Sequence, residues 1–313
     1  MKKVLTMTLN PCIDRTIYFK TFKQGATNYV DNLTEEAAGK GINVAVGLAH
    51  IGVPVKALGF AYADNAGLLY DKLDKEQIPH AFVELPGRMR VNQKLFDLST
   101  REMTECNERG LAVNSDDIER IMRLLEKELQ DAEILVLSGS VPPGVEKDIY
   151  ARMIRMAHEK GVKTVLDASG EAMELGCEEK PYLIKPNREE FVAAFLQENS
   201  NMKETDKRTE GGMLSGNMEQ KILEKAEELA ASGIKYVCIS LGEEGMLLTD
   251  KDGTQKYPAK ATDIQSLQGA GDAMVAGLCK AIYEKEEKNM AEYALTMAAS
   301  TISLPGTRMG TLE

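Results

Sequence analysis

Residues 134–166 read ILVLSGSVPPGVEKDIYARMIRMAHEKGVKTVL and contain the pattern that decides the fold class. Ile134–Leu137 is a short apolar run that predicts a buried strand, and Thr164–Leu166 predicts a second one. Between them, Lys147–His158 has the apolar spacing of an amphipathic helix. A helix between two buried strands is typical of parallel strand pairs, so this stretch indicates an α/β fold.

The same alternation recurs along the chain. Further strands are predicted at Val4–Leu9, Val55–Phe60, Tyr182–Ile184 and Tyr236–Leu241. Further helices are predicted at Asn43–Ile51, Asp116–Leu129 and Glu219–Ala231. We therefore expect one domain over residues 1–313, with a mainly parallel central sheet covered by helices.

Two regions alternate like strands without a helix between them, Ile13–Glu35 and Val91–Thr104. Ser99–Glu102 is polar and is predicted to form a hairpin tip in the second region. These regions predict a small antiparallel β lid, inserted at roughly residues 13–36 and 89–107.

Two other polar stretches are predicted to lie at the surface. Asp250–Gly253 is expected to turn a second hairpin, between Met246–Thr249 and Thr254–Tyr257. The polar stretch Gln197–Gly216 is expected to be a surface insertion.

Composition excludes several classes of protein. The net charge of −11 argues against a protein that binds nucleic acid or an anionic membrane. The five cysteines are scattered without a CxxC pair, which predicts free thiols in a reducing cytoplasm. Asn10-Pro11 interrupts the first apolar run, so neither a signal peptide nor a membrane span is expected.

The strongest local signal is Gly269-Ala270-Gly271-Asp272, followed by the apolar helix Ala273–Tyr283. Glycines before a helix leave its first amides free to bind an anion. A carboxylate there would repel an anion, unless it takes the proton of a hydroxyl that attacks a phosphate held by those amides. Taken alone, the four residues fit equally well an aspartate that caps the helix.

Two common nucleotide-binding signatures do not fit. The chain contains no GxxxxGK[ST], which excludes a Walker-type phosphate loop. Met274 stands where a dinucleotide fingerprint needs its third glycine, and the motif lies late in the chain. A hydride-transferring dehydrogenase is therefore not expected.

Six further motifs accompany this one. They are Thr8-Leu9-Asn10-Pro11 with Asp14, Ala38-Gly39-Lys40-Gly41-Ile42-Asn43, Ser138–Gly144 (SGSVPPG), Lys185–Glu190 (KPNREE), Ser240-Leu241-Gly242 with Gly245, and Pro305-Gly306-Thr307. In this order and number they resemble the PfkB (ribokinase-like) family of carbohydrate kinases over essentially the whole chain. TLNPxID and GKGINV resemble its branch of 1-phosphofructokinases and tagatose-6-phosphate kinases. The resemblance implies a three-layer α/β/α sandwich with a β lid, and ATP and Mg²⁺ as cofactors.

The resemblance also implies a role for each matching residue on the acceptor side. Asp272 would be the base, and the amides of Gly269, Ala270 and Gly271 would form the anion hole. The sugar phosphate would contact Asp14, Gly39, Lys40, Gly41, Asn43, Arg90, Glu105, Asn107 and Ser138. Lys40 and Arg90 would hold its phosphate. Taken alone, Asp14 is better explained as a turn residue, and Lys40 and Arg90 can also be solvated side chains.

On the nucleotide side, the resemblance assigns ATP to Lys185, Asn187, Ser240, Gly242, Gly245, Ala299 and Ser300. Asn187 and Glu190 would hold magnesium through water. Their spacing is also that of a helix capping box, which is the better interpretation of the two residues alone. Taken together with the anion hole at Gly269–Gly271, the magnesium role is favoured over the capping box.

Several positions depart from the family pattern, among them Ala38, Met89, Cys106 and Ser266-Leu267-Gln268. Because some lie around the sugar pocket, the acceptor stays open. We expect phosphorylation of fructose 1-phosphate to fructose 1,6-bisphosphate. The alternatives are a tagatose-6-phosphate kinase, a 6-phosphofructokinase, a kinase of an unphosphorylated sugar or nucleoside, and a non-catalytic sugar-phosphate sensor. Pairing of two lids in a homodimer is also expected.

Overall fold

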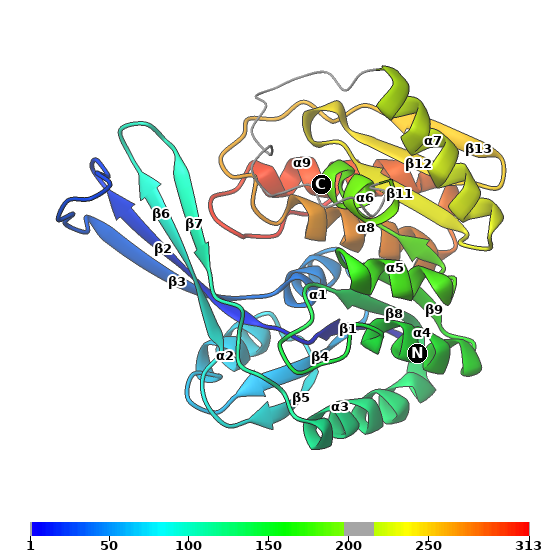
Figure 1. Ribbon diagram of the computed structural model, residues 1–313, viewed down its shortest axis with the longest axis horizontal. Helices are drawn as coiled ribbons and strands as arrows, with labels where there is room; N and C mark the ends of the chain where they lie inside the picture. The colour runs from blue at the N-terminus through cyan, green and yellow to red at the C-terminus, as the bar shows by residue number, and fades with distance from the viewer. Residues whose placement is uncertain (1, 197–215, 313) are drawn as a thin grey trace.

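The computed structural model describes residues 2–196 and 216–312, and it contains two sheets (Figure 1). The main sheet has nine strands in the order β13-β12-β11-β10-β9-β8-β1-β4-β5. Every pair from β11 to β5 is parallel, whereas β12 and β13 pair antiparallel. In spatial order these are β13 (Gly253–Tyr257), β12 (Met246–Asp250), β11 (Tyr236–Ser240), β10 (Leu183–Ile184), β9 (Lys163–Asp167), β8 (Ala132–Ser138), β1 (Lys3–Thr8), β4 (Val55–Tyr62) and β5 (His80–Leu85).

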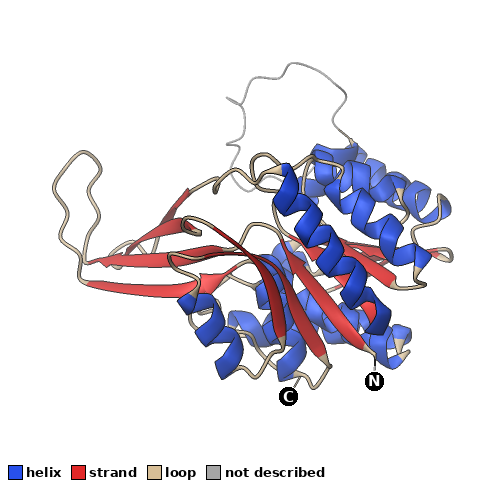
Figure 2. Cartoon of the chain, turned by 90° about the horizontal axis from the view of Figure 1, so that it is seen from below, coloured by secondary structure: helices blue, strands red, loops and turns tan. Residues whose placement is uncertain are grey.

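Helices cover both faces of the main sheet, as the view in Figure 2 shows. On one face, α1 packs against α8, and α8 against α9. On the other, α3 to α7 form a row in which each helix contacts the next. The bounds are α1 (Lys40–His50), α2 (Gly67–Lys75), α3 (Ser115–Glu128), α4 (Ile149–Glu159), α5 (Glu171–Glu178), α6 (Arg188–Phe195), α7 (Gly216–Ala231), α8 (Ala270–Glu284) and α9 (Met290–Ile302).

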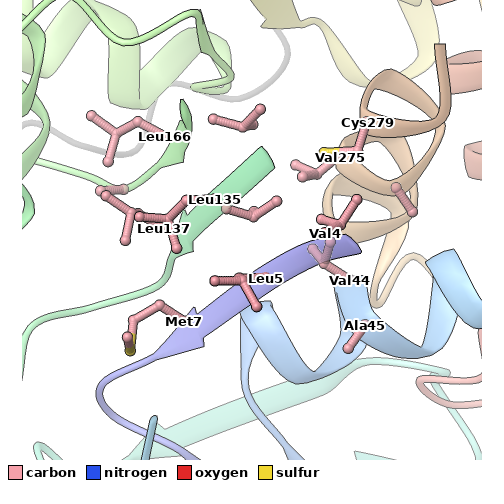
Figure 3. Packing of buried hydrophobic residues seen from close by; sticks show 14 of the residues in the cluster. Val4, Leu5, Met7, Val44, Ala45, Leu135, Leu137, Leu166, Val275 and Cys279 are labelled. Atoms are coloured by element: carbon pink, nitrogen blue, oxygen red, sulfur yellow. The ribbon is translucent and has the colours of Figure 1, made fainter. Parts of the chain in front are cut away.

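The core lies between the central strands and these helices (Figure 3). Val4 and Leu5 of β1 and Leu135 of β8 are fully buried, together with Val44 of α1 and Val275 of α8. Each such side chain contributes about 1.5–3 kcal/mol relative to an exposed one. This packing holds the start of α8 rigidly beside the carboxyl ends of the parallel strands, the usual place of a ligand site in such sheets.

The lid is the second sheet, which projects from the main body in Figure 1. Its order is β3 (Asn32–Ala38), β2 (Cys12–Phe19), β6 (Arg90–Asp97) and β7 (Met103–Asn107). The outer pairs β3-β2 and β6-β7 are antiparallel, as expected, whereas the central strands β2 and β6 run parallel. Each of them follows a strand of the parallel main sheet, β1 or β5, so both leave the body in the same direction.

All predicted strands and helices are present, and both hairpins turn where expected. α2, α5 and β5 were not predicted. Residues 197–215 of the expected insertion lie outside the described residues. No described helix is long and apolar enough to cross a membrane.

Candidate active site

The first turn of α8 presents free backbone donors. Gly269 precedes the helix with φ 76°, and the first helical bond runs from the Ala273 amide to the Gly269 carbonyl. The amides of Ala270, Gly271 and Asp272 have no acceptor among the described residues. The positive φ of Gly269 strains any residue that has a Cβ, so this turn favours glycine. The arrangement suits an anion.

Asp272 is buried beside these amides, with 7% of its surface exposed. Its carboxylate makes no capping bond to the helix; instead, Oδ2 accepts a hydrogen bond of 2.8 Å from Asn43 Nδ2. Burial and, secondarily, the charge of Asp167 raise the pKa of Asp272 to about 6, against the opposite effect of Lys40. A carboxylate with such a pKa is ionised at neutral pH and is a stronger base than an exposed one.

Asp167, at the end of β9, joins two lysines of the site. Its Oδ1 lies 3.3 Å from Lys40 Nζ and 3.3 Å from Lys185 Nζ. Burial would raise the pKa of Asp167, but Lys185 and Lys40 together hold it below its ordinary value. The Lys185 ammonium lies 3.5 Å from the point that a Cβ on Gly271 would occupy. The positive charge of Lys185 therefore adjoins the free amides.

Asp167 was not predicted from the sequence. A signal for it exists, because a carboxylate directly follows the buried strand predicted at Thr164–Leu166, and carboxyl ends of parallel strands line ligand sites.

A cavity of about 190 Å³ is lined by several of the residues predicted to bind the sugar phosphate. Its wall includes Lys40, Arg90 and Ser138. The Ser138 and Thr8 hydroxyls are buried without a partner among the described residues, so they are available to a ligand. Arg90 donates to the carbonyls of Asn10 and Glu108, which fixes its guanidinium at the cavity. Two cations and two hydroxyls suit a phosphate group.

Asp14 lies on lid strand β2 and is held by two side chains of β6. Lys94 Nζ lies 2.6 Å from Asp14 Oδ2, and Asn92 Nδ2 lies 3.1 Å from Oδ1. Lys94 was not predicted. Glu105 and Asn107 are exposed on β7 and bond to each other, and they pair across the sheet with Lys94 and Asn92 of β6, the two residues that hold Asp14.

Gly39 and Gly41 flank Lys40 where the chain passes close to β1. A Cβ on Gly41 would lie 2.5 Å from Thr8 Oγ1, and one on Gly39 would lie 2.8 Å from Thr8 Cγ2. Only glycine allows this approach, which places Lys40 at the first position of α1.

A larger cavity of about 750 Å³ lies at the α8 N-terminus. The predicted nucleotide residues Asn187, Ser240, Gly242, Gly245 and Ala299 line it, together with Ala270 and Gly271 of the anion site. Its apolar wall is formed by Ile264, Leu267, Met274, Leu295, Ala298 and Ile302. Such a slot can hold a flat base with its phosphates directed at the amides.

Ser300 does not contribute to this wall. Its hydroxyl accepts a hydrogen bond from the Thr311 amide, and the residue is absent from the lining of the large cavity. The prediction of Ser300 as part of the adenine wall is therefore wrong, because α9 turns that side chain toward the C-terminal segment.

Asn187 and Glu190 form a complete capping box at the start of α6. Asn187 Oδ1 accepts from the Glu190 amide at 2.7 Å, and Glu190 Oε2 accepts from the Asn187 amide at 2.9 Å. The capping interpretation is thus confirmed. The other carboxylate oxygen, Oε1, lies 3.7 Å from Lys40 Nζ, and Glu190 lines the smaller cavity. Glu190 therefore caps the helix and still presents one oxygen to the site.

Comparison with known proteins agrees with this geometry. The profile of the pfkB family carbohydrate kinases matches residues 7–313. The chain belongs to this family. It is 31% identical to the 1-phosphofructokinase of Vibrio cholerae serotype O1, over all of this chain and 93% of that protein. As a member of the family it is an ATP-dependent sugar kinase.

Solved structures of family members have the same architecture. Phosphofructokinase-2 from Escherichia coli, in complex with substrates and products, superposes with a TM-score of 0.85 at 28% identity, over 99% of this chain and 96% of that one. Ribokinase from Thermotoga maritima superposes with a TM-score of 0.74 at 18% identity, over 98% of this chain and 95% of that one. The second likeness shows the ribokinase-like fold.

Proposed function

We propose that this pfkB-family kinase transfers the γ-phosphoryl group of ATP to the free primary hydroxyl of fructose 1-phosphate, giving fructose 1,6-bisphosphate. One observation carries the proposal. The free amides of Ala270 and Gly271 line the base-sized apolar cavity, and Lys185 beside them shares Asp167 with Lys40 of the phosphate-sized cationic cavity. An acceptor in the cationic cavity and a donor in the apolar one would thus be joined through these two lysines, whose charges act on the buried Asp272.

The residues divide the reaction between them. Asp272 takes the proton of the attacking hydroxyl as its oxygen forms a bond to the γ-phosphorus. The bond between that phosphorus and the bridging oxygen breaks, and ADP leaves with the electron pair. The amides of Ala270 and Gly271 and the Lys185 ammonium face the charge on the transferring group.

Magnesium fits the residues present if the nucleotide supplies most of its ligands. No cluster of three or more acidic, histidine or cysteine side chains occurs in residues 2–196 and 216–312. Glu190 Oε1 remains outside the capping box and lies at the smaller cavity. One carboxylate oxygen plus phosphates and water is a usual magnesium environment. Bound there, the ion would neutralise phosphate charge, and Asn187 would keep Glu190 in place through the cap.

The choice of acceptor rests on Lys40, Arg90 and the 1-phosphofructokinases among the relatives. Phosphofructokinase-2 is the named activity of the solved relative, so fructose 6-phosphate is the second candidate. A coupled ADP assay with fructose 1-phosphate, fructose 6-phosphate, tagatose 6-phosphate and fructose separates them. We expect the highest kcat/KM with fructose 1-phosphate. Equal kcat/KM with free fructose would contradict the proposed substrate class, and no turnover with any acceptor would favour a sensor.

Two further proposals concern assembly and compartment. Exposed apolar side chains at the lid, Tyr29 (86% exposed) and Leu33 among them, support a homodimer in which two lids cover each other. Light scattering after size-exclusion chromatography tests it, and a monomer would contradict it. All five cysteines are free, which supports a cytoplasmic location. Recovery of the native protein in a periplasmic or extracellular fraction would contradict that location.

A further inference from the structure

Gln268 is one of the positions at which the sequence departs from the family pattern, and its side chain joins the lid to the anion site. Its Oε1 accepts a hydrogen bond of 2.9 Å from Lys94 Nζ on β6. Its Nε2 donates to Met103 Sδ on β7 at 3.2 Å. The next residue along the chain is Gly269, which opens the turn of free amides. A single amide group thus contacts two lid strands and adjoins the catalytic turn.

The partner of Gln268 is the same ammonium that holds Asp14. Lys94 is 5% exposed and lies 2.6 Å from Asp14 Oδ2. A buried ammonium is tolerated only when its donors find acceptors. Asp14 supplies one acceptor with a charge, and Gln268 supplies the second; no third acceptor exists among the described residues. Loss of the Gln268 oxygen would therefore leave a buried cation with a single partner.

We propose that Lys94 and Gln268 are positioning residues that couple the acceptor site on the lid to the amides that hold the transferring phosphate. The proposal rests on the kinase function given above. An acceptor hydroxyl on Asp14 fixes the carboxylate, the carboxylate fixes Lys94, and Lys94 fixes the side chain that precedes Gly269.

The backbone makes the coupling direct. Gly269 has φ 76°, a conformation that favours glycine, and it connects to Gln268 by one peptide bond. A displacement of Gln268 therefore changes the direction of the amides of Ala270 and Gly271. Anion-hole donors act only when they are aligned with the charge that develops, so small displacements lower kcat.

Gln268→Leu is the primary test, because it keeps the size of the side chain and removes both polar contacts. In the free protein we expect greater deuterium uptake in residues 92–96 and 268–272. With the preferred acceptor we expect kcat/KM for the sugar phosphate to fall about tenfold, the value of one hydrogen bond to a charged group. The KM for ATP should stay within about twofold.

Two variants make the test specific. Gln265→Leu is the same substitution on the same loop, at an exposed position whose side chain has no hydrogen-bond partner among the described residues, and it should change neither uptake nor kinetics. Gln268→Glu retains an acceptor for Lys94 and should return uptake to the wild-type level. Its kcat should stay low, because it places a carboxylate one residue before the amides.

Three results would contradict the coupling through Lys94 and Gln268: unchanged uptake and kinetics in Gln268→Leu, equal effects in Gln265→Leu, or equal uptake in Gln268→Glu and Gln268→Leu. Because deuterium uptake is measured without turnover, the coupling through Lys94 and Gln268 is tested even if the enzyme prefers another acceptor. A wild-type protein that phosphorylates nothing contradicts the proposed function, whereas an active wild type with an equally active Gln268→Leu contradicts only the coupling.

Discussion

The start of α8 and the lid sheet both contribute to the candidate site, but they are built differently. Asp272 and Lys185 are almost fully buried and packed against fully buried neighbours of α8 and β10. In the lid, β7 is exposed throughout, and Asp14 depends on two side chains of a neighbouring strand. The difference indicates a division of work in which the rigid body carries the chemistry and the lid selects the acceptor. Variants in the two regions should therefore affect different kinetic constants.

The largest effect is expected at the buried end, from Asp272→Asn. Removal of a general base should lower kcat by about 10²–10⁴-fold, with little change in nucleotide affinity. Coupled assays and nucleotide titration measure both. Retention of a tenth of the wild-type kcat would contradict the proposed difference between the two regions, because Asp272 of the main body would then not be the catalytic base.

The same variant has a pH-dependent effect on stability. The raised pKa of Asp272 means that the folded protein binds this proton more tightly than the unfolded chain. The stabilisation by this group is fully present below about pH 4 and is lost as pH rises through about 6. Asn has no charge to bury, so Asp272→Asn should be more stable above pH 6 by an amount on the order of 1–3 kcal/mol, and equally stable below pH 4. Urea unfolding at several pH values measures this.

A smaller effect on catalysis is expected from Asp167→Asn, which tests whether the lysines of the rigid body must be held in place for phosphoryl transfer. The variant leaves the buried Lys185 ammonium without its counter-charge and leaves Lys40 with Glu190 as its one ion-pair partner among the described residues. We expect kcat/KM to fall by about 10²-fold, since both cations shift, and the free energy of unfolding to fall by about 3–5 kcal/mol.

Asp252→Asn is the matched control for this variant, because Asp252 is exposed in the turn between β12 and β13. It should leave kcat/KM and the free energy of unfolding unchanged. Equal stability of Asp167→Asn and the wild type would mean that Asp167 does not hold the lysines in solution.

The smallest of these effects is expected at the lid, from Arg90→Lys. Lysine keeps the charge but loses the planar fork that now bonds to Asn10 and Glu108. We expect the KM for the sugar phosphate to rise about tenfold, with kcat and the KM for ATP within about threefold. Thr104→Ser, at an exposed position of β7 in the same sheet, should change neither constant by more than about twofold. A loss confined to kcat in Arg90→Lys would contradict the division of work.

The sequence predicted the site residues of the main body better than those of the lid. The body has strong local patterns, since buried strands, glycines at close approaches and the turn before α8 each require particular residues. Gly41 and Gly269 were therefore recognisable in advance, and Asp272 with them. Asp167 follows a predicted strand, but its role depends on two lysines that the fold brings to it from positions 40 and 185.

The lid was harder to predict, because its strands pair with partners distant in sequence. Lys94 appears as one polar residue in an alternating strand, and nothing local shows that it meets Asp14 or Gln268. The parallel pairing of β2 with β6 was missed for the same reason. Ser300 was assigned wrongly because the rotation of α9 is set by packing rather than by its sequence. Gly306 and Thr307 were recognised as a motif, yet the bond from Thr307 to Glu36 at the lid required the structure.

The pH dependence of kcat/KM tests the central claim most directly, namely that Asp272 acts as the base in a buried turn of free amides. For the wild-type enzyme with its preferred sugar phosphate, we predict activity that falls below an apparent pKa of about 6, as the buried carboxylate becomes protonated. A profile that stays flat down to pH 4.5 would contradict the claim, because the group that accepts the proton would then not be the buried carboxylate.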